Sequence, residues 1–341
     1  MSSYDKKIND FFYYWLISIF LLVFIMVIVG GLTRLTNSGL SITQWELFSG
    51  ILPPMNSMDW DKYFSLYKEI PQYKLINSSI SLNEFKIIFY WEYFHRILGR
   101  LIGLSFLIPL AYFYLSNKIN KKYLLSCLFI LILIILQGIV GWYMVKSGLV
   151  NSISVSHYRL SLHLIVAFFI ISMLFWLILN VKRKKNNDFF SNKKYCYYFY
   201  FLFFLIFTQI IIGAFVSGLD AGKIYQTWPL MGYSYFPDDI SVKTIKNLFL
   251  FDNHSLVQFY HRNIAYLLSL YILIIGYIIY KNKFTKLNNH FFLVIIFLFF
   301  QIVLGITTLL SGLNIYLASL HQICGLFLTL SAINLYYNYI N

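Results

Sequence analysis

Four of the seven histidines in this sequence stand in apolar stretches, where an imidazole is costly unless it has a partner or a function. They form two ordered pairs, His95 with His163 in the first half and His261 with His321 in the second. His95 and His261 are each followed by arginine and lie 166 positions apart, whereas the second members lie 158 apart. The remaining histidines are expected at span ends or in loops, in contact with water: His157, His254 and His290.

Two histidines that face each other across a helical bundle can ligate a heme iron from both sides. A zinc site would need three or four ligands, with cysteine or carboxylate nearby. The three cysteines lie in apolar stretches and form no Cys-x-x-Cys pair: Cys127, Cys196 and Cys324. A single intramembrane histidine could serve only a helix–helix hydrogen bond. Two matching pairs favour two heme sites.

A carboxylate accompanies one histidine pair and not the other. Glu92 precedes His95 by three positions, a spacing that puts both residues on one face of a helix. The matching position in the second half is Gln258, which is neutral. This asymmetry suggests chemistry in the first half and a fixed cofactor in the second. The alternative is an interfacial carboxylate paired with Arg96.

Four arginines near the same ends of the spans are candidates for heme propionates, because a guanidinium recognises a carboxylate with two hydrogen bonds. Ordinary anchoring at the membrane interface is the alternative. They are Arg96, Arg100, Arg159 and Arg262.

The composition requires a membrane to position these residues. Of 341 residues, 59% are hydrophobic and only 12% are charged, about half the share usual in a soluble domain. The mean hydropathy is +0.68. The net charge of +14 lies in short loops between apolar spans and forms no basic stripe, so a nucleic-acid partner is not expected.

Eight apolar stretches are long enough to cross a bilayer as helices, which takes about 20 residues each. The last 55 residues contain no Asp, Glu, Lys or Arg and are too long for one crossing, so a break is expected at residues 312–314. The expected spans are 11–33, 87–117, 123–145, 160–181, 195–219, 256–280 and two within 287–341.

The loop charges predict the orientation of these spans. The loops on the side of both termini, residues 1–10, 117–122, 182–194 and 281–286, carry 2, 3, 6 and 3 Lys or Arg residues. The opposite loops include two long ones, 34–86 and 220–255, which hold most of the acidic residues. Because positive loops stay in the cytoplasm, we expect both termini there and the four paired histidines near the outer side.

The two halves of the chain are related in sequence. Four residues recur 183 positions later, and Gln-x-x-x-Gly recurs after 164 positions. The recurring four are Gly30, Gly39, Trp45 and Pro54, which match Gly213, Gly222, Trp228 and Pro237. We therefore expect an all-α membrane protein of eight transmembrane helices, arranged as two pseudo-symmetric four-helix bundles in parallel repeat.

Several stretches resemble the heme A synthase family over nearly the whole chain. The similar segments are the first-loop sequence Gly30-Gly31-Leu32-Thr33-Arg34-Leu35-Thr36-Asn37-Ser38-Gly39-Leu40-Ser41, then Gly50-Ile51-Leu52-Pro53-Pro54, Phe89-Tyr90-Trp91-Glu92-Tyr93-Phe94-His95-Arg96 and Tyr158-Arg159-Leu160-Ser161-Leu162-His163-Leu164. Some relatives carry a cysteine pair in the first outer loop. This chain has none there and so resembles the alphaproteobacterial and mitochondrial type.

The resemblance implies oxidation of a ring methyl of heme O to a formyl group, which gives heme A for cytochrome oxidase. It implies that residues 1–190 form a bundle in which His95 and His163 flank the substrate and Glu92 is catalytic, as a base or as an electrostatic stabiliser. It implies that residues 191–341 form a bundle in which His261 and His321 hold a resident heme b.

The resemblance further implies a multi-pass protein of the bacterial inner membrane. The partners that it implies are heme O, membrane lipid, heme O synthase (the protoheme farnesyltransferase) and cytochrome oxidase assembly factors, and a homo-oligomer is compatible with it. Two other functions stay open from the residues alone. A diheme membrane cytochrome that passes electrons from a quinol would use the same four histidines. A transporter would also contain repeats, but no paired discontinuous helices are evident here.

Overall fold

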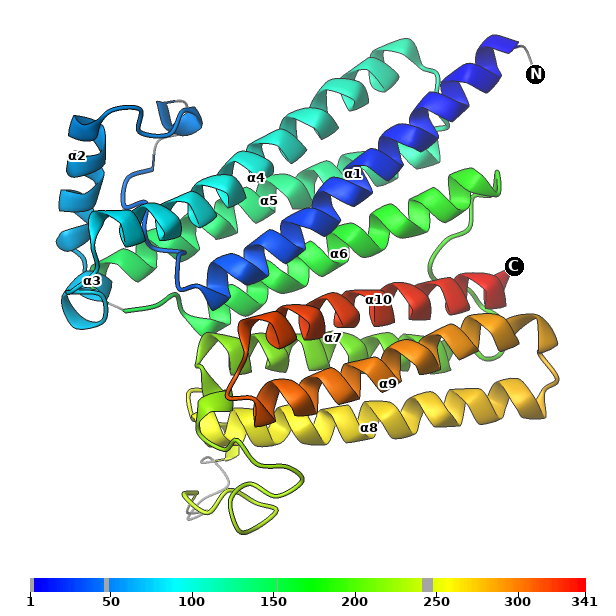
Figure 1. The fold of residues 1–341 in the computed structure, drawn as a ribbon. Coiled ribbons are helices and arrows are strands. Elements are labelled where there is room, and N and C mark those ends of the chain that lie inside the picture. Colours follow the sequence, from blue (N-terminus) through cyan, green and yellow to red (C-terminus); the bar gives the residue numbers. More distant parts are fainter. Residues whose placement is uncertain (1–2, 46–48, 152, 241–247) are drawn as a thin grey trace. The chain divides into compact units, whose positions relative to one another are not determined.

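The computed structural model describes residues 3–45, 49–151, 153–240 and 248–341, which are mainly helical (Figure 1). Residues 1–2 of the expected cytoplasmic N-terminal segment, and residues 46–48 and 241–247 of the two long outer loops, lie outside the described residues. Eight described helices are long and apolar enough to cross a membrane, as expected. The chain is therefore an all-α, multi-pass membrane protein.

Each of the eight helices coincides closely with an expected span, because uncharged apolar runs of this length leave few other choices in lipid. Their bounds are α1 (Ser3–Leu35), α4 (Leu82–Ser116), α5 (Lys121–Asn151), α6 (His157–Lys182), α7 (Cys196–Gly218), α8 (His254–Lys281), α9 (Asn288–Leu310) and α10 (Ile315–Ile340). The described short helices are α2 (Ser57–Lys68), α3 (Pro71–Leu75) and the 3-10 turns η1 (Ser49–Ile51), η2 (Ala221–Lys223) and η4 (Thr285–Leu287).

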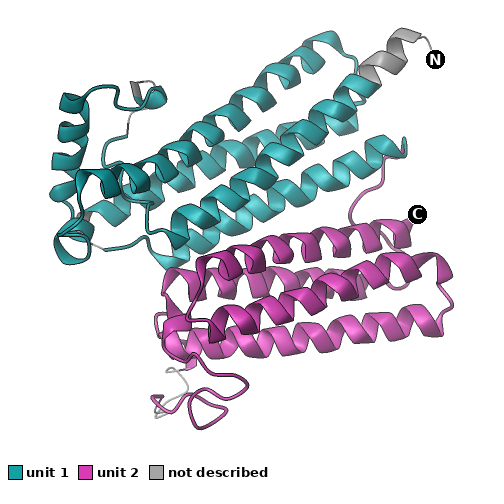
Figure 2. Cartoon of the chain, in the orientation of Figure 1, with its two compact units in different colours: residues 1–184 teal, residues 185–341 magenta. Residues whose placement is uncertain are grey.

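The chain divides into two compact units, residues 1–184 and residues 185–341, which Figure 2 colours separately. In the first unit α1 packs against α4 and α6, and α5 packs against the same two helices. The four helices thus form a closed ring in which α4 and α6 face each other across the bundle. In the second unit α8 and α10 likewise face each other, since each packs against both α7 and α9.

Helix α4 begins five residues before the expected start at Ile87. Ser81 caps it, because its hydroxyl accepts from the Glu84 N–H at 3.3 Å while the Glu84 carboxylate accepts from the Ser81 N–H at 2.7 Å. This reciprocal capping box satisfies two backbone donors at the helix start. The capping-box pattern Ser-x-x-Glu is present in the sequence at residues 81–84. The consequence is that His95 lies more than three turns inside α4 rather than in its first turns.

The expected break in the last apolar stretch lies at residues 311–314. Gly312 and Leu313 both have left-handed backbone conformations, with φ of +71° and 65°, which end α9. Asn314 then caps α10, because its side-chain oxygen accepts from the N–H groups of Tyr316 and Leu317 at 3.0 and 3.3 Å. The second member of each histidine pair follows the start of its helix, α6 or α10, by about two turns.

The loop between α1 and α4 has a small aromatic core of its own, formed where α2 packs against α4 and where α3 packs against α2 and α5. At its centre the Tyr67 hydroxyl donates to Gln72 at 3.0 Å and accepts from Asn77 at 2.8 Å. Burial raises the pKa of the Tyr67 phenol above its ordinary value, so the hydroxyl keeps its proton and remains a donor. The Gln72 amide donates to the Asn37 carbonyl at 3.1 Å, which ties this core to the end of α1.

A proline within α4 removes one hydrogen bond from the helix. Pro109 has no N–H, so the carbonyl of Ser105, one turn earlier, lacks its usual helical donor. The indole N–H of Trp15 on α1 donates to that carbonyl at 2.9 Å. Trp15 is buried and so supplies, inside the bundle, the donor that lipid cannot.

Candidate functional site

The first histidine pair faces across the bundle of residues 1–184. His95 lies on α4 and His163 on α6, the two helices that face each other in the ring. Their ring centres are 6.3 Å apart, and the ring planes make an angle of 49°. The structure therefore brings together two residues that are 68 positions apart in the sequence. Both rings are partly buried.

The second pair repeats this arrangement within residues 185–341. His261 lies on α8 and His321 on α10, which also face each other across their bundle. The ring centres are 6.4 Å apart at an angle of 73°. The separations in the two units agree within 0.1 Å, although the angles differ.

Each histidine ring of the first unit packs against a glycine on a neighbouring helix. A Cβ atom added at Gly30 of α1 would lie 3.2 Å from Nε2 of His95. A Cβ added at Gly141 of α5 would lie 3.1 Å from Cε1 of His163. Both distances are tighter than ordinary van der Waals contact, so any larger residue would push the ring. The histidines thus occupy one diagonal of the bundle, and the glycines that make room for them occupy the other.

Glycines serve the second pair in the same way. A Cβ added at Gly213 of α7 would lie 3.0 Å from Cε1 of His261, and one added at Gly305 of α9 would lie 2.9 Å from Cε1 of His321. All four glycines are among the repeated residues of the sequence, where they marked the repeat without a role. In the structure these glycines have a role: because they lack a side chain, the helix backbone can lie close to the histidine ring.

Three glutamines lie one turn before three of these glycines and contact the same histidines. The contacts are Gln137 Nε2 to the His163 carbonyl at 2.9 Å, Gln209 Nε2 to the His261 carbonyl at 3.1 Å and to its Nδ1 at 3.2 Å, and Gln301 Nε2 to His321 Nε2 at 3.3 Å. The amide groups therefore help to fix the backbone or the ring of each histidine. Sequence reasoning did not assign them to the site, although the repeated Gln-x-x-x-Gly pattern pointed to them.

Glu92 is buried and fully hydrogen-bonded. Its Oε2 accepts from the Ser41 hydroxyl at 2.8 Å and from the Ile42 N–H at 2.9 Å. Its Oε1 accepts from Nε and Nη2 of Arg96 at 3.1 and 2.6 Å. The Arg96 guanidinium also donates to the Ile42 carbonyl at 2.9 Å. The ion pair considered from the sequence is therefore present. Its two side chains also bind Ser41 and Ile42 and so hold the loop that follows α1 against α4.

Gln258 contacts the matching loop position in the second unit, with the hydrogen bond in the opposite direction. Its amide donates to the Tyr225 carbonyl at 2.8 Å, and Arg262 donates to the same carbonyl at 3.3 Å. Tyr225 follows Ile42 by 183 positions, the offset of the repeat. Both units thus fasten the loop after their first helix to their second helix, one through a carboxylate and the other through a neutral amide. The fastening alone does not require a charge.

The other arginines considered for propionates lie on α4, α6 and α8. Arg159 donates to the hydroxyls of Ser147 and Tyr143 and lies over the Tyr143 ring, 4.6 Å from its centre. Arg262 also donates to the Leu230 carbonyl at 3.2 Å. Arg100 lies one turn after Arg96 on α4 and is partly buried.

The three remaining histidines differ in exposure. His254 is exposed, as expected. The expectation was wrong for His157, which is buried at the start of α6 with its ring centre 4.1 Å from that of Tyr158. Aromatic packing at a helix start removed it from water. His290 is partly buried and contacts the Asn334 amide at 3.1 Å.

No group of three or more His, Cys, Asp or Glu side chains suited to a metal ion occurs among the described residues. Each histidine pair therefore supplies two strong ligands and no more. This favours a metal whose other positions are filled by a macrocycle.

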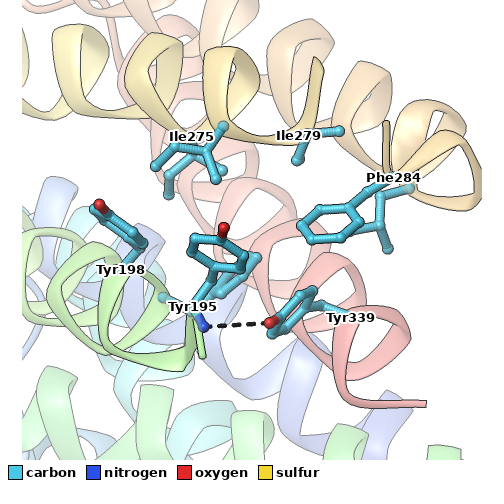
Figure 3. A pocket seen from close by; sticks show the side chains of 9 residues that line it. Tyr195, Tyr198, Ile275, Ile279, Phe284 and Tyr339 are labelled. Atoms are coloured by element: carbon cyan, nitrogen blue, oxygen red, sulfur yellow. Dashed lines mark hydrogen bonds between the residues drawn. The ribbon is translucent and has the colours of Figure 1, made fainter. Parts of the chain in front are cut away.

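A narrow pocket in residues 185–341 lies away from the paired histidines of that unit (Figure 3). It is lined by apolar and aromatic side chains near the start of α7, whereas the His261 contact lies near the end of that helix. Its one polar contact drawn is the Tyr195 N–H, which donates to the Tyr339 hydroxyl at 3.2 Å. We attribute no catalytic role to it.

The sequence was compared with known proteins. A family model described as cytochrome oxidase assembly protein matches residues 13–333. The chain belongs to this family. The cytochrome oxidase assembly protein family is thus matched across both units, and the matched range includes Glu92 and all four paired histidines.

Similar members of the family carry the name heme A synthase. The one from Pelagibacter ubique is 51% identical over 318 residues, which is 93% of this chain and 93% of its own length. The one from Parvibaculum lavamentivorans is 45% identical over 257 residues, 75% of this chain and 74% of its own. The one from Rickettsia bellii is 42% identical over 310 residues, 90% of this chain and 92% of its own.

Proposed function

We propose that this protein is a heme A synthase, an oxidoreductase that converts the ring methyl of heme O into the formyl group of heme A. The observation that carries the proposal is the pair of imidazoles facing across each bundle. Membership of a family whose similar members are named heme A synthase supports the same reaction. A bound heme would supply the redox chemistry, and the chain would supply ligands, orientation and charge.

The histidine pairs fit an iron porphyrin in three respects. If two imidazoles bound one metal through bonds of about 2 Å, their ring centres would lie roughly 6 Å apart. Both observed separations between ring centres agree with this value. The glycines let a helix backbone lie close to each ring. The buried Nδ1 atoms of His163 and His321 have no hydrogen-bond partner among the described residues, so a ligand nitrogen is available.

We assign different roles to the two pairs. His261 and His321 would hold a resident heme b, and His95 and His163 would flank heme O. The asymmetry between Glu92 and Gln258 supports this division, since both side chains bind the backbone of the loop but only the one in the first unit carries a charge. Heme O carries a farnesyl tail, so a site within a membrane helix bundle keeps that tail away from water.

We assign Glu92 the catalytic role in the first unit and favour electrostatic stabilisation over proton abstraction. Both carboxylate oxygens already accept two hydrogen bonds each, so taking up a proton would disrupt one of these contacts. A fixed, preorganised negative charge stabilises positive charge that develops nearby in a reaction, and it does so without reorganisation. Its place one helical turn from His95 puts it beside the proposed substrate.

We place the protein in the bacterial inner membrane, as the resemblance to the heme A synthase family implies. The distribution of loop charges puts both termini in the cytoplasm. The paired histidines then lie in the outer half of the bilayer. Heme O synthase would supply the substrate, and cytochrome oxidase assembly would consume the product. These partners follow from the proposed reaction.

The test is to delete this gene in its own host, or to express the chain in a bacterium that makes heme O but no heme A, and to extract the hemes. We expect heme O to accumulate in the deletion strain and heme A to appear on expression. A protein that carries bound heme but leaves the heme O to heme A ratio unchanged in both strains would instead be a diheme cytochrome, and the proposal would be wrong.

A further inference from the structure

The four glycines that contact the paired histidines are preceded one turn earlier by a residue that points to the same place. In three helices this residue is glutamine, and in α1 it is Met26. The glutamine cases are Gln137 before Gly141, Gln209 before Gly213 and Gln301 before Gly305. Met26 precedes Gly30 by the same four positions. One histidine of the four therefore has methionine where the others have an amide.

Met26 occupies the position of a glutamine in space as well as in sequence. A Cβ added at Gly99, four residues after His95, would lie 3.5 Å from the Met26 methyl carbon. A Cβ added at Gly325, four residues after His321, would lie 3.3 Å from the amide nitrogen of Gln301. Both side chains thus reach the helical turn that follows their histidine. Methionine and glutamine are similar in length, so the packing is retained while the chemistry changes.

The chemical difference bears on how firmly each histidine is held. The amides of Gln209 and Gln301 lie within hydrogen-bond distance of ring nitrogens of His261 and His321. The Gln137 amide donates to the main-chain carbonyl of His163 and so holds its backbone. A thioether has no N–H to donate. The His95 ring is therefore confined by its contact with Gly30 but receives no amide from the adjacent helix position.

We propose that His95, the one paired histidine that is tied to an amide at this position through neither its ring nor its backbone, is the exchangeable ligand of the first unit, the imidazole that turns aside when a heme enters and leaves. This rests on the proposed function, in which the first unit handles a heme that is turned over. In the second unit both histidines are held by amides, which suits a heme that remains bound. Met26 is then a positioning residue, because its side chain has no N–H that could hold His95 in place.

The experiment exchanges the two side chains between the units in the full-length protein. The variants are Met26→Gln and the reverse change Gln209→Met, each loaded with heme b as the probe and reduced. Carbon monoxide binds a heme iron with two protein ligands only when one ligand leaves, so its binding rate reports that departure. Each substitution lies in one unit, so the phase that it changes belongs to that unit.

We expect the wild-type protein to bind carbon monoxide in a faster and a slower phase. Met26→Gln should slow the faster phase about fivefold, the effect of roughly one hydrogen bond, and leave the slower one unchanged. Gln209→Met should accelerate the slower phase by a similar factor. Met26→Leu, which adds no donor, is the matched control and should keep the wild-type rates.

Unchanged rates in both exchange variants would overturn the proposal, as would equal slowing by Met26→Leu, which would implicate packing instead. If Met26→Gln does not fold, Gln209→Met still decides, because it must release His261 if the amide is the restraint. The assay needs neither heme O nor oxidation. A failure to make heme A in cells would therefore refute the proposed function without affecting the carbon monoxide result. Unchanged carbon monoxide rates would refute the exchangeable ligand without affecting the proposed function.

Discussion

Glu92 combines two tasks, of which its counterpart in the second unit performs only one. As a hydrogen-bond acceptor it fastens the Ser41–Ile42 segment to α4, and as an anion it pairs with Arg96. Gln258 performs the fastening with an amide. An uncharged side chain is therefore structurally adequate at this position, and the retained charge calls for a reason outside the fastening.

Replacing Glu92 by glutamine should separate these tasks. The variant copies the second unit and should fold and keep its resident heme, while the rate of heme A formation should fall by roughly 10²–10⁴-fold, as for loss of a group that acts in the transition state. The measurement is the heme A to heme O ratio in extracts, beside the heme b content of the purified protein. Ser41→Ala removes the hydroxyl that contacts Glu92 and the Ile88 carbonyl but no charge, and serves as the control with a much smaller loss. A normal rate in Glu92→Gln would make the residue a loop fastener only.

The paired histidines give a second prediction at this scale. His261→Ala should lose the resident heme b, because one of its two proposed ligands is gone. His95→Ala should keep most of that heme and lose heme A formation. The bound heme is measured from the absorption spectrum of the purified protein, with activity in extracts alongside. Equal losses of heme in the two variants would mean that the roles are not divided between the units as proposed.

At the scale of the elements, one side-chain hydrogen bond joins α1 to α4 at the place where Pro109 removes a helical donor. Trp15→Phe should destabilise the protein by about 1–3 kcal/mol, because the Ser105 carbonyl is left without a donor in a buried place. Thermal unfolding in detergent measures the loss. In a Pro109→Ala background the helix regains its own N–H donor, so the same tryptophan change should cost distinctly less. Equal costs in both backgrounds would show that the indole contributes packing alone.

The spans were predictable because lipid leaves a long uncharged run little choice but a helix. The small helices α2 and α3 were not, since amphipathic segments outside the membrane carry no such constraint and were treated as loop. The early start of α4 does not follow from the apolar run, because the capping box at Ser81–Glu84 extends the helix beyond it. The histidine pairing was predictable from the repeat, whereas the glycine and glutamine contacts needed the ring order of the helices.

At the scale of the molecule, the two units share one ring order, with the histidine-bearing helices on one diagonal. The proposed orientation puts residues of the first outer loop outside and those of the 182–194 loop in the cytoplasm. Met58→Cys, at an exposed position of α2, should react with an impermeant maleimide in intact spheroplasts, and Asn187→Cys only after lysis. The three native cysteines are buried, which keeps the background low. The opposite labelling pattern would reverse the topology.

The bond from Trp15 to the Ser105 carbonyl also bears on the order of biosynthesis. The ribosome makes α1 before α4, so the indole is already in the membrane when the proline-containing helix leaves the translocon. The carbonyl that Pro109 leaves without a donor can then meet its partner at once instead of waiting in hydrocarbon. A circularly permuted chain in which α4 is made before α1 would lose this head start, and we expect it to insert and mature less efficiently even though every native contact remains available to it.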